Sequence, residues 1–172
     1  MNLSENANNH GIYPLSAINL SEIRYDVFGK IALVDADLLD GGTRHPNLAI
    51  MKLSGYFKSN GCEVRLIENY SELYTENEYK NEKHDVYCDF TEALKYDAIY
   101  ISKVFDFTNI NDELLHLSNV YIGGTGFFFD HAPNLPDCIE HHMPDYHIYD
   151  QYIEHDNKHK NKKVYFSQKR NT

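Results

Sequence analysis

The stretch that decides the fold reads Lys30-Ile-Ala-Leu-Val-Asp-Ala-Asp37 and continues, after a glycine-containing loop, as His45-Pro-Asn-Leu-Ala-Ile-Met-Lys-Leu-Ser-Gly-Tyr-Phe-Lys-Ser-Asn-Gly-Cys-Glu-Val-Arg-Leu-Ile67. The apolar run at 31–34 predicts a buried strand that ends in two aspartates. Residues 47–59 predict a helix, and Asn60-Gly61 ends it because glycine adopts the left-handed conformation at little cost. Residues 64–67 are rich in β-formers and predict a second, parallel strand, which completes a βαβ unit. The expected buried face of the helix carries Ala49, Ile50, Leu53, Tyr56 and Phe57.

The same order of elements recurs downstream. Two further apolar runs, at 96–103 and 119–126, end in polar or glycine residues, and a short helix is expected between them over 109–117. A short helix over 137–142 and a fifth strand over 144–149 follow. We therefore predict an α/β domain with an open, mostly parallel five-stranded sheet, flanking helices and a flavodoxin-like strand order.

Polar and glycine residues follow three of these strands. Because ligands of open parallel sheets bind beyond the carboxyl ends of the strands, we expect Asp35, Asp37, Ser102, Lys103 and the loop 123–126 to converge on one edge. Each has a plainer interpretation as well. The aspartates are equally typical of strand-end caps, the lysine of a solvent-exposed side chain, and the glycines of a turn. The glycine loop is not a dinucleotide fingerprint, since the third glycine is missing and Phe127-Phe-Phe129 is not expected to open a helix.

Charge is unevenly distributed along the chain. The 172 residues include 26 Asp or Glu and 16 Lys or Arg, for a net charge of −10, yet the last sixteen residues carry six Lys or Arg and no acid. An acidic body repels phosphate backbones, so no nucleic-acid partner is expected. No stretch approaches the roughly 20 apolar residues that cross a bilayer, and no secretory signal is recognisable, so we expect no membrane partner and a cytoplasmic location.

Composition divides the chain into three parts. Residues 1–29 are an irregular lead-in, 30–150 form the α/β domain, and 151–172 form a basic tail that is expected to be disordered. Six of the ten histidines follow residue 130, but without paired cysteines or fixed metal-ligand spacing they indicate surface residues rather than a metal site.

Five segments, in order, resemble the cobalamin-binding-like, Rossmann-like domain that stands N-terminal in radical S-adenosylmethionine proteins. They are residues 30–37, 45–54, 96–105, 121–126 and 135–146. The resemblance implies that cobalamin is a candidate ligand, although the Asp-x-His-x-x-Gly signature of a lower-face histidine is replaced by Asp35-Ala-Asp-Leu-Leu-Asp40. The resemblance and the positions of the strand ends together indicate the candidate cofactor-binding residues. They are Asp35, Asp37, Asn47, Ser102, Lys103, Gly123, Gly124, Thr125 and Gly126.

The chain departs from that family in its cysteines. Radical members continue into a barrel whose Cys-x3-Cys-x2-Cys loop holds a [4Fe–4S] cluster, whereas Cys62, Cys88 and Cys138 are far apart here. The resemblance therefore implies a ligand-binding or accessory domain without an iron–sulfur cluster, catalytic residues or radical chemistry of its own. It is expected to be a truncated gene product or one half of a split enzyme, and a free-standing ligand-binding domain is the remaining form. A separately encoded radical barrel is the expected partner. The alternative is a protein-interaction subunit that covers the active site of such a barrel.

Overall fold

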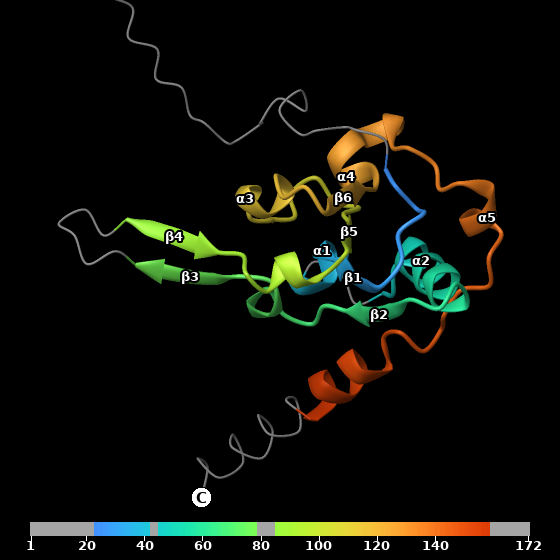
Figure 1. Cartoon of the computed structure of the whole chain (residues 1–172), viewed down its shortest axis with the longest axis horizontal. Helices are drawn as coiled ribbons and strands as arrows, with labels where there is room; N and C mark the ends of the chain where they lie inside the picture. Colours follow the sequence, from blue (N-terminus) through green and yellow to red (C-terminus); the bar gives the residue numbers. More distant parts are fainter. Residues whose placement is uncertain (1–22, 42–44, 79–84, 159–172) are drawn as a thin grey trace, which may run out of the picture.

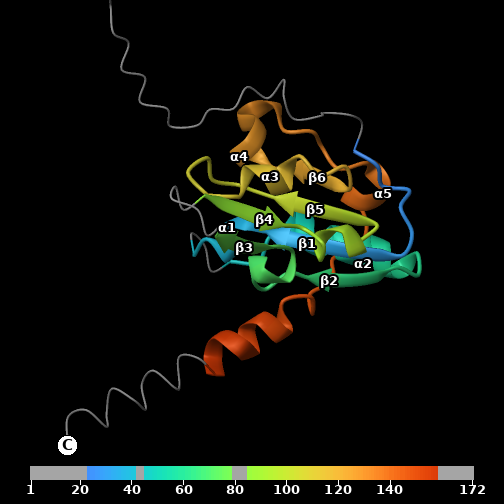
Figure 2. The same cartoon turned by 60° about the vertical axis from the view of Figure 1, so that its left-hand side comes forward.

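The computed structural model describes residues 23–41, 45–78 and 85–158, and its centre is a four-stranded parallel sheet. The strands are β1 (Lys30–Asp35), β2 (Glu63–Leu66), β5 (Ala98–Ser102) and β6 (Val120–Gly123), in the order β2-β1-β5-β6. All three strand pairs are parallel. Figures 1 and 2 show β1 and β5 in the middle of the sheet. The chain thus fills the sheet to one side of β1 and then crosses to the other, which makes the β1–β5 boundary its topological switch point.

The βαβ unit forms as expected from the sequence. Helix α2 (Leu48–Ser59) is capped by Asn47, whose side-chain oxygen accepts hydrogen bonds from the backbone N–H of Ala49 and Ile50 at 3.0 and 3.4 Å. It ends before Gly61, which has a φ of +82°. Five of its residues are buried, namely Ile50, Met51, Leu53, Ser54 and Phe57, while Ala49 and Tyr56 of the expected face are only half-buried.

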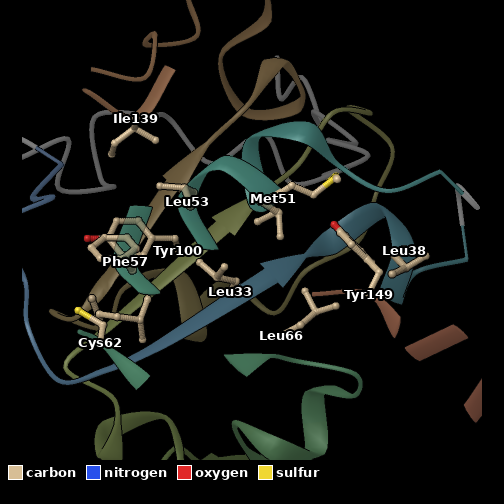
Figure 3. Packing of buried hydrophobic residues seen from close by; sticks show 13 residues of the cluster. Leu33, Leu38, Met51, Leu53, Phe57, Cys62, Leu66, Tyr100, Ile139 and Tyr149 are labelled. Atoms are coloured by element: carbon tan, nitrogen blue, oxygen red, sulfur yellow. The ribbon is translucent and has the colours of Figure 1, made fainter. Parts of the chain in front are cut away.

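Apolar side chains cover both faces of the sheet, which explains why β1 and β5 read as continuous apolar runs. On one face, α2, α5 (Asp137–Glu140) and residues 23–28 pack over Leu33 and Tyr100. Figure 3 shows Phe57 and Tyr100 within this cluster, with Tyr149 at its Leu38 end. The other face is covered by α3 (Asp112–Leu115), by α4 (Thr125–Phe128) and by two short 3-10 turns, η2 (Tyr70–Glu72) and η3 (Ala93–Lys95).

The remaining short elements complete the chain. Helix α1 (Ala36–Leu39) follows β1 directly, and η4 (Phe129–His131) follows α4. Strands β3 (Thr75–Glu78) and β4 (Val86–Asp89) pair antiparallel and extend away from the parallel sheet in Figure 1. None of the helices in the described parts of the chain is long and apolar enough to cross a membrane.

The predicted fifth strand is wrong, because residues 146–149 form a turn. This segment is attached to α2 instead of to a sheet edge. The backbone N–H of Asp145 donates to the Met51 carbonyl at 2.9 Å, and its carboxylate accepts hydrogen bonds from Ser54 and Lys58 at 2.7 and 2.6 Å. These hydrogen bonds hold the segment against α2, where its backbone does not pair with a strand of the sheet.

Residues 150–158 are helical, where the sequence analysis expected the start of a disordered tail. Tyr152 packs against the core cluster, and Nδ1 of His155 lies 2.5 Å from a carboxylate oxygen of Glu68. Much of the predicted lead-in (residues 1–22) and the rest of the predicted tail (159–172) lie outside the described residues.

Candidate functional site

The carboxyl ends of β1, β5 and β6 lie side by side. In the sheet register Asp35 is paired with Ser102, and Ser102 with Gly123. Asn47, at the start of α2, joins this edge because its side-chain amide donates a hydrogen bond to the Ser102 hydroxyl at 2.9 Å. The structure therefore brings together residues that lie far apart in the sequence, and their individual contacts decide what each can do.

Asp35 is a buried structural carboxylate. It is 1% exposed, caps α1 by accepting the Leu38 N–H at 3.2 Å, and accepts the Tyr149 hydroxyl at 2.7 Å. The same hydroxyl accepts a hydrogen bond from the backbone N–H of Asn47 at 3.1 Å. Burial raises the pKa of Asp35, and the hydrogen bonds from Tyr149 and Leu38 oppose that rise. Burial and the nearby Asp35 carboxylate raise the pKa of Tyr149, so this hydroxyl stays protonated.

Asp37 holds the loop that follows β5. Its carboxylate accepts hydrogen bonds from the backbone N–H groups of Val104 and Phe105 at 2.7 and 3.2 Å and from the Thr108 hydroxyl at 2.5 Å. The side chain is 1% exposed. These bonds match the strand-end cap interpretation of this aspartate, because a carboxylate with three protein donors is committed to the fold.

Lys103 points back onto its own loop. Its ammonium group donates to the carbonyl oxygens of Asp106 and Thr108 at 3.3 and 3.2 Å and lies 5.0 Å from the centre of the Phe127 ring. Backbone oxygens and an aromatic face thus occupy the positions that a bound anion would take.

The glycine loop fits closely against the backbone that follows β5. Gly124 has a φ of +104°, and a Cβ there would lie 2.2 Å from the Lys103 carbonyl oxygen. The N–H of Gly126 donates to that oxygen at 2.9 Å, and the Thr125 hydroxyl donates to the Val104 carbonyl at 3.0 Å. The glycines therefore allow the backbone of this loop to pack closely against the backbone of Lys103. The expectation that no helix opens here is wrong, since α4 begins at Thr125, although it spans only four residues.

An apolar cavity of about 160 Å³ lies beside these strand ends. Four of the nine candidate residues line it, namely Ser102, Gly123, Gly124 and Thr125, whereas the other five do not. The remaining lining residues come from β5, β6 and α2, from 23–25 and from the segment after η4. They are Ile23, Tyr25, Ala49, Leu53, Tyr100, Ile101, Tyr121, Ile122, Ala132, Pro133 and Leu135.

Sequence reasoning missed the tyrosines of this cavity. The chain has 14 tyrosines, so each one carries little weight in the sequence. The strand register provides the missing signal, because Tyr100 and Tyr121 are direct partners on β5 and β6, two positions before the strand ends. Side chains two apart on a strand share a face, which places both tyrosines on the face of Ser102 and Gly123.

The described residues do not fit cobalamin. The cavity is smaller than the roughly 300–1,000 Å³ typical of pockets for drug-sized ligands, and a corrinoid is larger than such a ligand. Asp35, Asp37 and Lys103 are already bonded within the protein, and the close packing of Gly124 on Lys103 leaves no gap there for a cofactor tail.

Comparisons of the chain with protein-family models, with curated proteins and with solved structures find no match.

Proposed function

We propose that this chain is a ligand-binding or accessory domain related to the cobalamin-binding-like domains of radical S-adenosylmethionine proteins, without radical chemistry of its own. The strand order supports this relationship. Numbered along the chain, the four parallel strands run 2-1-3-4, which corresponds to the first four strands of the flavodoxin-like order 2-1-3-4-5. The proposal concerns a binding domain and assigns no catalytic residue. A cytoplasmic location and the lack of a nucleic-acid partner remain predictions from the sequence.

The cavity beside Ser102 is the observation that carries the binding proposal. It lies at the carboxyl ends of β5 and β6, the edge at which ligands of open parallel sheets bind. Ser102 is also the register partner of Asp35 across the switch point of the sheet. An apolar cavity with a few polar groups at one end is the usual form of a small-molecule site.

Ligand titration followed by methyl NMR tests this function. The methyl groups of Leu53 and Leu135 belong to the cavity side of the sheet, whereas those of Leu73 and Leu114 lie in the core on the opposite face of the sheet. A panel of small neutral molecules should shift the first group saturably and leave the second unchanged. If no member of the panel moves the cavity methyls selectively, the binding function is wrong.

Cobalamin provides a separate arm of the same test. Since the cavity does not fit a corrinoid, equilibrium dialysis with hydroxocobalamin should show no retention by the protein. Stoichiometric retention would overturn the geometric argument against this ligand and restore cobalamin as the candidate.

A second function, an interaction subunit that covers a separately encoded radical barrel, is favoured by an aromatic patch at the same edge. Phe105 and Phe107 stack with ring centres 5.2 Å apart, and Phe107 and Phe129 are 66% and 63% exposed. Large exposed apolar patches mark interaction sites. The test is co-purification with the product of a neighbouring reading frame that carries Cys-x3-Cys-x2-Cys. Phe107→Asp should abolish it, while Phe28→Asp, at another exposed phenylalanine, should not.

A further inference from the structure

The wall that the described residues give this cavity is uncharged. Among these residues the fifteen that line it include no Asp, Glu, Lys, Arg or His. An ionised group placed against such a wall would lose its hydration without gaining a partner, which costs several kcal/mol or more. This chemistry excludes phosphates, carboxylates and ammonium groups and selects a neutral ligand.

The size of the cavity selects a single ring. An engineered protein cavity of about 150 Å³ binds benzene, and the cavity here measures about 160 Å³. Tyr100 helps to hold the wall of this cavity by donating a hydrogen bond from its hydroxyl to the Arg24 carbonyl.

Three tyrosine rings make the cavity suited to an aromatic ring. The Tyr100 ring stacks on Tyr121 with centres 5.2 Å apart and planes 24° apart, and on Tyr25 at 5.9 Å and 9°. All three residues line the cavity. Aromatic pairs gain contact energy beyond the area that they bury, so a lining with three tyrosines favours an aromatic guest over a puckered aliphatic ring of the same volume.

Ser102 supplies a directed polar contact. Its hydroxyl oxygen accepts a hydrogen bond from the Asn47 amide, which leaves the hydroxyl proton able to donate to another acceptor. The residue is 7% exposed and lines the cavity. A ligand oxygen at this end would accept that proton while its ring lies among the tyrosines.

We infer that the cavity binds a neutral, single-ring aromatic compound with one oxygen that accepts a hydrogen bond from Ser102. This inference names the ligand class of the proposed binding function and rests on it. It goes beyond that function in three respects that can be tested separately, namely the charge, the aromaticity and the polar contact of the ligand.

The experiment compares phenol, cyclohexanol, benzoate and benzene in methyl NMR titrations of the whole chain. Phenol should bind most tightly. Ser102→Ala should weaken phenol binding about threefold to tenfold, the effect of one hydrogen bond, and leave benzene binding unchanged. If benzoate or cyclohexanol binds as tightly as phenol, or if Ser102→Ala affects benzene equally, the inferred ligand class is wrong although the binding function stands.

Cavity-filling variants locate the site. Ala49→Leu adds volume at the cavity wall and should abolish phenol shifts, whereas Leu48→Ala, at the adjacent 53% exposed position, should preserve them. Ala132→Leu adds volume at another lining residue and replaces Ala49→Leu as the test if that variant does not fold. Phenol binding that survives in a folded cavity-filled variant would place the ligand elsewhere and overturn the inference. If no probe in the broader neutral panel shifts the cavity methyls, the inference and the proposed function fail together.

Discussion

The hydroxyl of Tyr149 donates a hydrogen bond to the carboxylate of Asp35, 114 residues earlier in the chain, at a distance of 2.7 Å. Both side chains are almost fully buried. The same hydroxyl accepts the N–H of Asn47, so one oxygen joins the end of β1, the start of α2 and the turn that precedes the helix at 150–158. This contact keeps the candidate edge and the C-terminal part of the described chain together.

Replacing Tyr149 with phenylalanine should destabilise the protein. The change removes the hydroxyl donor to the buried Asp35 carboxylate, which keeps only the Leu38 N–H, and it removes the hydroxyl that accepts the Asn47 N–H. We expect a loss of about 1.5–3 kcal/mol in the free energy of unfolding. Urea unfolding measures it. Tyr146→Phe removes the same atom from a residue that is 63% exposed and should change stability by less than about 0.5 kcal/mol. If Tyr149→Phe and Tyr146→Phe change the free energy of unfolding equally, the buried Tyr149–Asp35 hydrogen bond does not stabilise the protein.

Gly124→Ala should be far more harmful than Gly123→Ala. At Gly124 the φ is positive and the new Cβ would meet the Lys103 carbonyl oxygen at 2.2 Å, whereas at Gly123 nothing lies within 4 Å. For Gly124→Ala we expect the free energy of unfolding to fall by more than about 2 kcal/mol, because the backbone is strained and the Lys103 backbone must move. For Gly123→Ala we expect a nearly unchanged free energy of unfolding. Thermal unfolding of both proteins checks this. A stable Gly124→Ala protein would mean that the loop is not held against Lys103.

Leu53→Ala tests the buried face of α2. Leu53 is 5% exposed, so the truncation should cost about 2–5 kcal/mol, the range for a large-to-small change in a core. Leu48→Ala on the same helix is the control, since Leu48 is 53% exposed and should lose less than about 0.5 kcal/mol. If Leu53→Ala lowers the free energy of unfolding only slightly, Leu53 does not lie on the face of α2 that packs against the sheet.

Asp145 should make stability depend on pH. Burial alone would raise the pKa of Asp145, but hydrogen bonds from Lys58 and Ser54 outweigh burial and lower it below its usual value. A lowered pKa in the folded state means that stability from this group is present above the unfolded pKa, about 4, and is lost as the pH falls through the folded value. Asp145→Asn should flatten this part of the profile in urea unfolding between pH 7 and pH 3. Asp106→Asn, at an exposed position, should follow the wild-type profile.

Asp35 should act with the opposite sign. Because burial raises its pKa in the folded state, its contribution is greatest below the unfolded pKa and is lost as the pH rises through the folded value. The stability difference between the wild type and Asp35→Asn isolates this group, and it should shift in favour of the wild type as the pH falls below 7. A difference that shifts in favour of Asp35→Asn on acidification would contradict the assigned direction for Asp35.

Local sequence determined the βαβ unit and the two later parallel strands. Apolar runs of strand length, the Asn47 cap and the glycine after α2 act through neighbouring residues, and neighbouring residues are visible in the sequence. Parallel pairing then brought the strand ends to one edge, so the position of the candidate site at that edge could be predicted. What each side chain does there could not be predicted from local pattern.

Only the tertiary structure decided the rest, because the deciding partners are distant in sequence. Residues 144–149 have the composition of a strand, yet the bonds of Asp145 to α2 and of Tyr149 to Asp35 hold them in a turn. The polar linker after β2 forms the β3–β4 hairpin through pairing across residues 75–89. In the sequence, Gly124 is typical of a ligand-binding loop, and only the structure shows that it packs against Lys103. The tyrosine-lined cavity forms between β5, β6, α2 and residues 23–25, which are separate in the sequence. A cavity is the space between elements, so no single stretch of the sequence encodes it.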